Sequence, residues 1–308
     1  MRGEKRKKME KGKITVFTPT YNRERSISRV YESLKKQTYK NFEWLIIDDG
    51  STDNTKEVVE KFKKENLIKI RYIYQKNQGK HIAINNAVNN TDSELFLIAD
   101  SDDAFVSYAL EVFIFEWKRI KEKDKYKGII VRSFSASNFE VIGKDFPKYR
   151  IDANELDGLF KLKLKGEKWS IFKTEVLREF KFPDIPGIKF YPETIIWQKI
   201  ARKYLTRYVN IPLRIYYKDQ ENALTNKNTT RYKENIYLWE HIINEVNDYF
   251  FYDIKLFIKS YVGLSRDGTL NGFSLKKIVS IPNKLYKKMI LILLYPVGKI
   301  LAKMRSIK

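Results

Sequence analysis

The sequence predicts an α/β protein in which a mixed, mostly parallel sheet is flanked by helices and followed by a helical C-terminal region. Between residues 14 and 103, four short apolar or β-branched runs alternate with polar loops and segments of helical periodicity. Strands joined in this way pair in parallel through right-handed crossovers. The apolar fraction of 43% is enough for a substantial core, and from about residue 232 apolar residues recur at helical spacing.

Each of the first four predicted strands ends in a polar loop. The strands are predicted at residues 14–17, 42–47, 68–74 and 95–99, with helices at 26–34, 55–65, 82–88 and 106–123. Parallel strands present their carboxyl ends at the same edge of a sheet, where open α/β sheets bind ligands. We therefore expect the four loops to meet at one site.

The last of these strands runs directly into three acids. Leu95–Ala99 is an apolar run typical of a buried central strand, and Asp100, Asp102 and Asp103 follow it. Carboxylates so close together repel unless a cation lies among them, and oxygen ligands suit a hard divalent ion such as Mg²⁺ or Mn²⁺. Cysteine is absent and there are two histidines, which disfavours thiolate or histidine-rich metal sites. The alternative is a solvated turn in which Asp103 caps a helix that begins near Ala104.

Four loop motifs occur in a characteristic order: Pro19-Thr20-Tyr21-Asn22-Arg23-Glu24, Asp48-Asp49-Gly50-Ser51-Thr52-Asp53, Asn77-Gln78-Gly79-Lys80 with Asn85, and Asp100-Ser101-Asp102-Asp103. Together they make residues 13–135 resemble the nucleotide-sugar half of a family 2 glycosyltransferase with the Rossmann-like GT-A fold. The resemblance implies an enzyme that binds a nucleotide sugar, usually a uridine diphosphate sugar.

The resemblance also implies roles for individual residues. It assigns the donor nucleotide to Pro19, Thr20, Tyr21, Glu24, Asp48, Asp49, Gly79, Lys80, Asp100 and Ser101. It assigns Mn²⁺ or Mg²⁺ on the diphosphate to Asp102 and Asp100. Carboxylates can accept a hydrogen bond from a base imide, and a divalent ion can neutralise a departing diphosphate. Lys80, near a helix start, is a diphosphate contact or simply a solvated lysine.

Residues 136–220 are predicted to form the acceptor half of a catalytic domain that spans residues 13–220. The sequence indicates strands at 128–131, 171–172 and 209–217, and helices at 153–162, from Thr174 and from Pro192 to Tyr204, with no clear periodicity before Arg150. By resemblance this half shapes the acceptor site, for which the candidates are Trp169, Tyr191 and Trp197.

The same resemblance places the catalytic base at Glu193, with Glu167 in reserve. The family more often has Glu-Asp at this helix start, whereas this chain has Glu193-Thr194. Inversion requires a carboxylate outside the metal motif to take the proton of the acceptor hydroxyl. The alternative is that Glu193 only complements the helix dipole.

The formal net charge of +22 is concentrated at the two ends of the chain. Residues 1–13 have a net charge of +5, and residues 276–308 contain nine Lys or Arg and no acid, so together they hold 14 of the 22 charges. We expect residues 1–12 to be a mobile lead-in and residues 221–308 to be helical, with the aromatic residues in the core. The basic amphipathic segment 276–308 is expected either to lie on an anionic membrane surface or to pack as a helix with a solvated basic face.

These observations predict a glycosyltransferase that moves one sugar from a nucleotide-diphosphate sugar to a glycan or lipid-linked acceptor, with inversion, in surface polysaccharide or glycoconjugate synthesis. The rivals are a nucleotidyltransferase of similar fold and a basic nucleic-acid-binding protein, although no nucleic-acid-binding motif accompanies the charge. No early apolar run resembles a signal peptide, and no uninterrupted apolar run reaches about 18 residues. We therefore expect a cytoplasmic protein, peripheral on the inner face of the plasma membrane.

Overall fold

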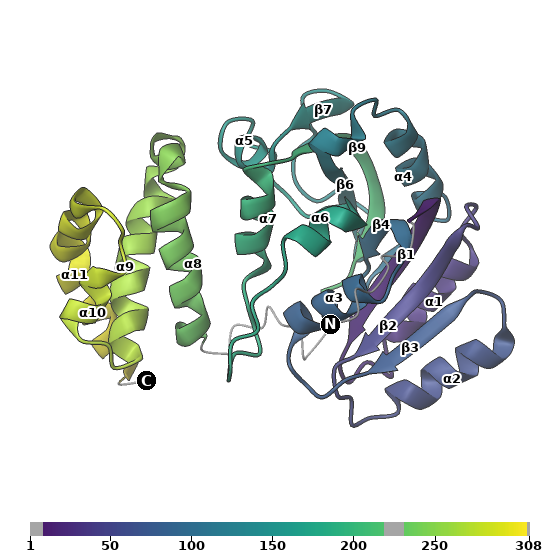
Figure 1. Cartoon of the computed structure of the whole chain (residues 1–308), viewed down its shortest axis with the longest axis horizontal. Coiled ribbons are helices and arrows are strands. Elements are labelled where there is room, and N and C mark those ends of the chain that lie inside the picture. Colours follow the sequence, from purple (N-terminus) through teal and green to yellow (C-terminus); the bar gives the residue numbers. More distant parts are fainter. Residues whose placement is uncertain (1–8, 219–230, 307–308) are drawn as a thin grey trace, which may run out of the picture. The chain divides into compact units, whose positions relative to one another are not determined.

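The computed structural model describes residues 9–218 and 231–306, and the chain divides into two compact units (Figure 1). The first unit comprises residues 1–189 and 198–221, and the second comprises residues 190–197 and 222–308. Residues 190–197, which the sequence analysis assigns to the catalytic domain, group with the C-terminal helices because Tyr191 packs on Tyr237, their ring centroids 5.8 Å apart.

Two predicted segments fall largely outside the described residues. These are the lead-in at residues 1–12 and residues 221–230, the first part of the C-terminal region that is predicted to be helical. The described part of the lead-in differs from the prediction, because residues 10–12 already belong to the first strand, where Glu10 N–H donates to Asp92 O at 2.9 Å.

Within residues 9–218, nine strands form one sheet in the order β3-β2-β1-β4-β8-β6-β9-β5, with β7 paired to β9. Their bounds are β1 Glu10–Thr20, β2 Phe42–Asp48, β3 Ile70–Tyr74, β4 Ser93–Ile98, β5 Ala104–Phe105, β6 Tyr126–Ser135, β7 Arg150–Ala153, β8 Lys168–Lys173 and β9 Leu205–Tyr216.

The first four strands are parallel, as predicted. Ile14 of β1 pairs with Phe42 of β2 and with Leu95 of β4, and Trp44 of β2 pairs with Ile70 of β3. Beyond β4 the sheet becomes mixed, because β8 runs antiparallel to both β4 and β6. The predicted mixed, mostly parallel sheet is confirmed, and the carboxyl ends of β1 to β4 lie at one edge.

Helices cover both faces of the sheet (Figure 1). One face packs against α1 (Ile27–Lys35), α2 (Thr55–Glu65) and α4 (Ala109–Lys118), and the other against α3 (Lys80–Asn89) and α6 (Thr174–Glu179); a short helix, α5 (Glu155–Phe160), and a 3₁₀ turn (Lys123–Lys125) complete the unit. Neighbouring residues of a strand point to opposite faces. Val16 thus joins the core under α1, while Phe17 stacks on Phe96 on the other face, with ring centroids 5.3 Å apart.

The segment after the acids differs from the prediction. Ala104–Phe105 pairs with β9 as strand β5, and α4 begins only at Ala109. Asp103 therefore does not cap a helix at Ala104, and its Oδ1 accepts a hydrogen bond from Tyr217 N–H at 3.3 Å. The sequence also gave no sign of β7, which is short and has two half-exposed residues at its start.

The second unit is helical in its described part. It contains the start of α7 (Glu193–Ala201), then α8 (Tyr232–Glu245), a 3₁₀ turn (Asn247–Tyr252), α9 (Ile254–Leu270), α10 (Leu275–Ser280) and α11 (Leu285–Ser306). Glycines allow close packing: a Cβ added at Gly298 would lie 2.4 Å from Ser265 Cβ. Within the described residues, none of the helices combines the length and the apolarity that a bilayer crossing requires.

Candidate active site

The loops that follow the four parallel strands are joined by contacts along the carboxyl edge of the sheet. The loop after β1 meets the loop after β2, where Asn22 N–H donates to Ser51 Oγ at 2.9 Å. The loop after β3 meets the loop after β4, where Lys80 Nζ lies 2.8 Å from Asp100 Oδ1. The structure thus brings the four sequence motifs together in the first unit.

Asp49 links the loop after β2 to the loop after β3. Its carboxylate is 5% exposed and accepts three hydrogen bonds of 2.8 Å, from the Gln75 side chain and from the backbone N–H groups of Gln78 and Gly79. Three donors on one buried carboxylate fix the path of the chain into α3.

The Asp48 carboxylate is also hydrogen-bonded within the protein. Its Oδ1 accepts from Ser51 N–H at 2.7 Å and its Oδ2 accepts from Tyr72 Oη. A carboxylate has about four lone-pair positions, so Asp48 and Asp49 each keep capacity for a further donor. Their contact with a nucleotide base stays a prediction. Residue type alone did not reveal that both carboxylates also hold the loops in place.

Gly79 begins α3 and must be glycine. Its φ is +96°, and a Cβ at this position would lie 1.9 Å from the Lys189 carbonyl oxygen. The close approach of two backbones places Lys80 as the first residue of α3, with its ammonium group on Asp100. Lys80 is therefore an ion-pair partner of the acid loop and not a solvated side chain.

The predicted nucleotide contacts on the first loop differ in exposure. The Tyr21 ring is 46% exposed, whereas Thr20 and Ser101 are buried and Pro19 is half-buried. Glu24 holds the start of α2, because its Oε2 accepts from Asn54 N–H and Nδ2 at 3.0 and 2.8 Å.

The three acids after β4 have different electrostatic environments. Burial raises the pKa of Asp100, but Lys80, helped by Arg214 and Arg23, outweighs this effect and holds that pKa below its ordinary value. Burial raises the pKa of Asp102, and the Asp100 carboxylate raises it further. Burial raises the pKa of Asp103 to about 7, although the Arg214 guanidinium acts in the opposite direction.

Arg214 is a site residue that the sequence analysis missed. The side chain is buried, with Nη1 3.3 Å from Asp103 Oδ2, Nη2 donating to Glu167 Oε2 at 3.0 Å, and Nε donating to Ser133 at 3.0 Å. It therefore connects Glu167, the reserve candidate for the base, to the acid loop. The sequence does contain one indication of this role, because Arg214 stands inside the apolar run of a predicted strand. An arginine in such a place is buried only when it is paired with an acid.

Asp100 and Asp102 fit a divalent cation as part of its ligand set. Among residues 9–218 and 231–306, no group of three or more Asp, Glu or His side chains is arranged to hold a metal ion. Mg²⁺ is commonly held by only one or two carboxylates plus substrate phosphates, and Mn²⁺ favours the same oxygen donors.

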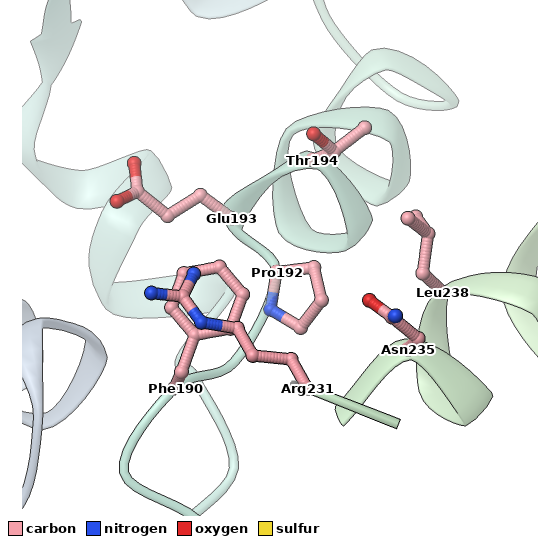
Figure 2. Close-up of a pocket in the computed structure, with 7 residues that line it drawn as sticks. All are labelled: Phe190, Pro192, Glu193, Thr194, Arg231, Asn235 and Leu238. Atoms are coloured by element: carbon pink, nitrogen blue, oxygen red, sulfur yellow. The ribbon is translucent and has the colours of Figure 1, made fainter. Parts of the chain in front are cut away.

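Glu193 lies in the second unit, at the wall of a pocket of about 410 Å³. Figure 2 shows the Glu193 carboxylate and the Arg231 guanidinium on one side of the pocket, with Asn235 and Leu238 on the other. The guanidinium lies 3.8 Å from the centroid of the Phe190 ring. An aromatic ring, an acid and two polar donors in one concave site are suited to a sugar or another polyhydroxylated molecule.

The predicted acceptor aromatics are not equivalent. Trp169 is 3% exposed in the core of the first unit, where its indole N–H donates to Ile98 O at 2.6 Å, so its ring offers no surface to an acceptor. Tyr191 is 7% exposed, and Trp197 is half-buried. Phe190 is the aromatic residue that lines the pocket, together with Arg231, Asn235 and Leu238, which the sequence analysis did not single out.

A mixed α/β sheet in which the loops after four parallel strands meet beside a pair of acids is the arrangement of a GT-A glycosyltransferase. The model of Glycosyl transferase family 2 matches residues 15–180, more than half of the chain. The chain belongs to this family, which confirms the predicted family, fold and enzyme class.

Known relatives agree with this assignment. An uncharacterized glycosyltransferase of Rickettsia felis is 37% identical over 138 residues, which are 41% of this chain and 23% of the relative. The GalNAc(5)-diNAcBac-PP-undecaprenol beta-1,3-glucosyltransferase of Campylobacter jejuni is 26% identical over 220 residues, 69% of this chain and 67% of the relative. The chain thus spans about a quarter of the length of the rickettsial relative.

Among solved structures, S. aureus TarS 1–349 in complex with UDP-GlcNAc has a TM-score of 0.64 and 18% sequence identity, over 95% of this chain and 92% of that one. At 18% identity this similarity shows a shared fold and nothing about the substrate.

Proposed function

We propose that this protein transfers a single sugar from a uridine diphosphate sugar to a glycan or lipid-linked acceptor, with inversion, in polysaccharide or glycoconjugate synthesis. The observation that carries the proposal is the set of contacts that joins the four motif loops at one edge of the sheet, with Asp100 and Asp102 in the last of them. Lys80 and Arg214 add positive charge beside these acids, which suits an anionic donor.

The proposed reaction is a direct displacement. Glu193 takes the proton of an acceptor hydroxyl, whose oxygen forms a bond to the anomeric carbon while the bond from that carbon to the diphosphate oxygen breaks. The nucleoside diphosphate leaves with the bonding electron pair, and the configuration at the sugar carbon is inverted. Glu193 supports this role through its place on a pocket that also offers Phe190, Arg231 and Asn235.

We propose that Asp102, helped by Asp100, holds Mn²⁺ or Mg²⁺. When bound, such an ion neutralises charge on the departing diphosphate. The proposal rests on the carboxylate oxygens of Asp100 and Asp102, which follow the buried strand β4 at the carboxyl edge of the sheet.

A lipid-linked acceptor is supported by the Campylobacter jejuni relative, whose name describes a glucosyltransferase acting on a GalNAc(5)-diNAcBac-PP-undecaprenol. An acceptor of this kind would bring the enzyme to the inner face of the plasma membrane. We propose this peripheral location on the same basis, together with the cationic segment 276–308.

Calorimetric titration of UDP into the full chain, with and without Mn²⁺, tests the donor site. The parent should bind UDP at least about tenfold more tightly with Mn²⁺, and Asp102→Asn should lose this gain while keeping its far-ultraviolet spectrum. Asp124→Asn is a matched control, because the Asp124 side chain is 97% exposed and lies on a turn remote in sequence from the motifs. Metal-dependent UDP binding that survives Asp102→Asn unchanged would remove Asp102 from the proposal.

A further inference from the structure

The longest helix of the second unit leaves an apolar face uncovered. α11 packs along α9 (Figure 1), with buried positions that include Leu291, Gly298 and Ala302. Its opposite side exposes large apolar side chains: Leu285 75%, Met289 63%, Ile292 53%, Leu293 78%, Val297 48%, Ile300 61% and Met304 61%. At 100° per residue these positions share one arc of roughly 140° that runs the length of the helix. An apolar strip of this kind on a protein surface marks an interaction site.

Cations border this face on one side. By the same periodicity, Lys288 and Lys299 lie just outside one edge of the arc, and Lys303 lies just inside that edge; these three residues form the lysine border. Residues 276–308 contain nine Lys or Arg and no Asp or Glu, so this segment is strongly cationic. Long lysine stems can keep their ammonium groups at a polar boundary while neighbouring apolar side chains are buried.

We propose that α11 lies in the plane of an anionic lipid bilayer, with its Leu285–Met304 face among the acyl chains and the lysine border at the lipid head groups. Burial of an apolar helix face together with attraction of cations to acidic lipids is the mode of binding of interfacial helices. This inference deepens the proposed peripheral location of the enzyme. It requires neither donor nor acceptor, so membrane binding and sugar transfer can fail separately.

A second copy of the chain fits this face less well. A two-fold contact is isologous, so α11 of each copy would meet α11 of the other. In an antiparallel pair the lysine borders of both helices would come together, and residues 276–308 contain no acid to compensate them. A leaflet rich in acidic lipids supplies the complementary charge.

Co-sedimentation of the full chain with vesicles tests the proposal. We expect binding to phosphatidylcholine vesicles that contain about 30% phosphatidylglycerol, and little binding to pure phosphatidylcholine. The double variant Leu293→Gln/Ile300→Gln should lower the partition coefficient at least about tenfold. The triple variant Lys288→Gln/Lys299→Gln/Lys303→Gln should weaken binding to acidic vesicles and reduce its dependence on salt.

Matched controls come from the first unit. Leu67→Gln replaces an apolar side chain that is 63% exposed, and Lys61→Gln/Lys64→Gln removes two exposed cations of α2, so all these variants should bind vesicles as the parent does. Equal pelleting of the parent and the Leu293→Gln/Ile300→Gln variant would overturn the proposal. Sedimentation equilibrium without vesicles tests the alternative of a second copy. If the parent is a dimer and the Leu293→Gln/Ile300→Gln variant is a monomer, the membrane proposal is overturned and the face is a dimer contact.

UDP binding, measured on the same samples, separates the two proposals. All α11 variants should keep the Mn²⁺-dependent affinity of the parent for UDP. A parent that binds vesicles and not UDP would support the membrane proposal and contradict the proposed function.

Discussion

Glu193 and Glu167 are the carboxylates proposed as the base, and their surroundings differ. Glu193 stands at the first turn of α7 on a pocket wall, whereas Glu167 accepts a hydrogen bond from the buried Arg214. We propose Glu193 for proton transfer because it lies on the pocket wall, and Glu167 for fixing the loop before β8 through its hydrogen bond with Arg214.

We expect Glu193→Gln to reduce turnover about a hundredfold or more, with donor affinity unchanged, because a positioned base contributes at least this much. The measurement is sugar transfer under saturating donor, paired with UDP titration. Glu167→Gln is the comparison variant and should retain more activity. Full activity of Glu193→Gln together with an inactive Glu167→Gln would exchange their roles.

His81 follows Lys80 in α3 and is 2% exposed. Burial lowers the pKa of the imidazole, while Asp184 and Asp49 act in the opposite direction. A group whose pKa is depressed on folding stabilises the protein above its unfolded pKa, which is about 6.5 for histidine, and this contribution is lost as the pH falls through the folded pKa.

The parent should therefore lose stability on acidification from pH 7 to pH 5.5, and His81→Phe, which keeps an aromatic ring beside Phe182, should lose less. Urea midpoints across this range measure the difference. The other histidine, His241, is present in both proteins, so the comparison isolates His81. Parallel curves for the two proteins would contradict the assignment.

At the scale of elements, β6 carries a buried charge pair. Lys127 is fully buried, contacts Glu155 of α5 through its ammonium group, and lies over the Phe172 ring with Nζ 4.4 Å from the centroid. Burial lowers the pKa of Lys127, and Glu155 opposes that effect. A pair of this kind contributes little net stability, but removal of one partner leaves an uncompensated buried charge.

Glu155→Gln should therefore lower the free energy of unfolding by about 3 kcal/mol, whereas Lys127→Met/Glu155→Leu should change it by about 1 kcal/mol or less. Urea denaturation of both variants and the parent decides this. If the double variant is as unstable as the single one, the pair contributes directly to stability.

The elements show how far the sequence predicts structure here. Strong alternation of apolar runs, acidic loops and helical spacing located β1 to β4. β1, β2 and β4 are largely buried and therefore apolar, whereas β3, at the edge of the sheet, is half-buried. β5 and β7 were missed because they are two and four residues long and depend on β9, which is distant in sequence. The pocket at Glu193 was also invisible, because Phe190 and Arg231 meet only through the tertiary structure of the second unit.

At the scale of the whole molecule, the net charge must be interpreted together with its distribution along the chain. A net charge of +22 suggests nucleic-acid binding, but residues 1–13 and 276–308 hold 14 of these charges. Attraction to a polyanion through such segments is sequence-independent and sensitive to salt. Binding of UDP at the site in the first unit should instead depend on the metal.

Binding of the full chain to a random single-stranded oligonucleotide should thus fall at least about a thousandfold between about 50 and 200 mM salt. Over the same range, Mn²⁺-dependent affinity for UDP should change only a few-fold. Fluorescence anisotropy for the oligonucleotide and calorimetry for UDP provide the measurements. Tight oligonucleotide binding that persists at the higher salt concentration would favour the nucleic-acid rival.

The central place of β1 also governs when the protein can fold during synthesis. One edge of β1 pairs with β2, but the other edge pairs with β4, as in the Ile14–Leu95 pair, and so stays unpaired until β4 has been synthesised. At ribosomal speed the second edge stays open on the order of ten seconds, long enough for an unpaired apolar strand to aggregate or meet a chaperone. Nascent chains stalled before Ser93 should be retained by chaperones, and chains stalled after β8 emerges should be released, as pull-down of ribosome complexes can show.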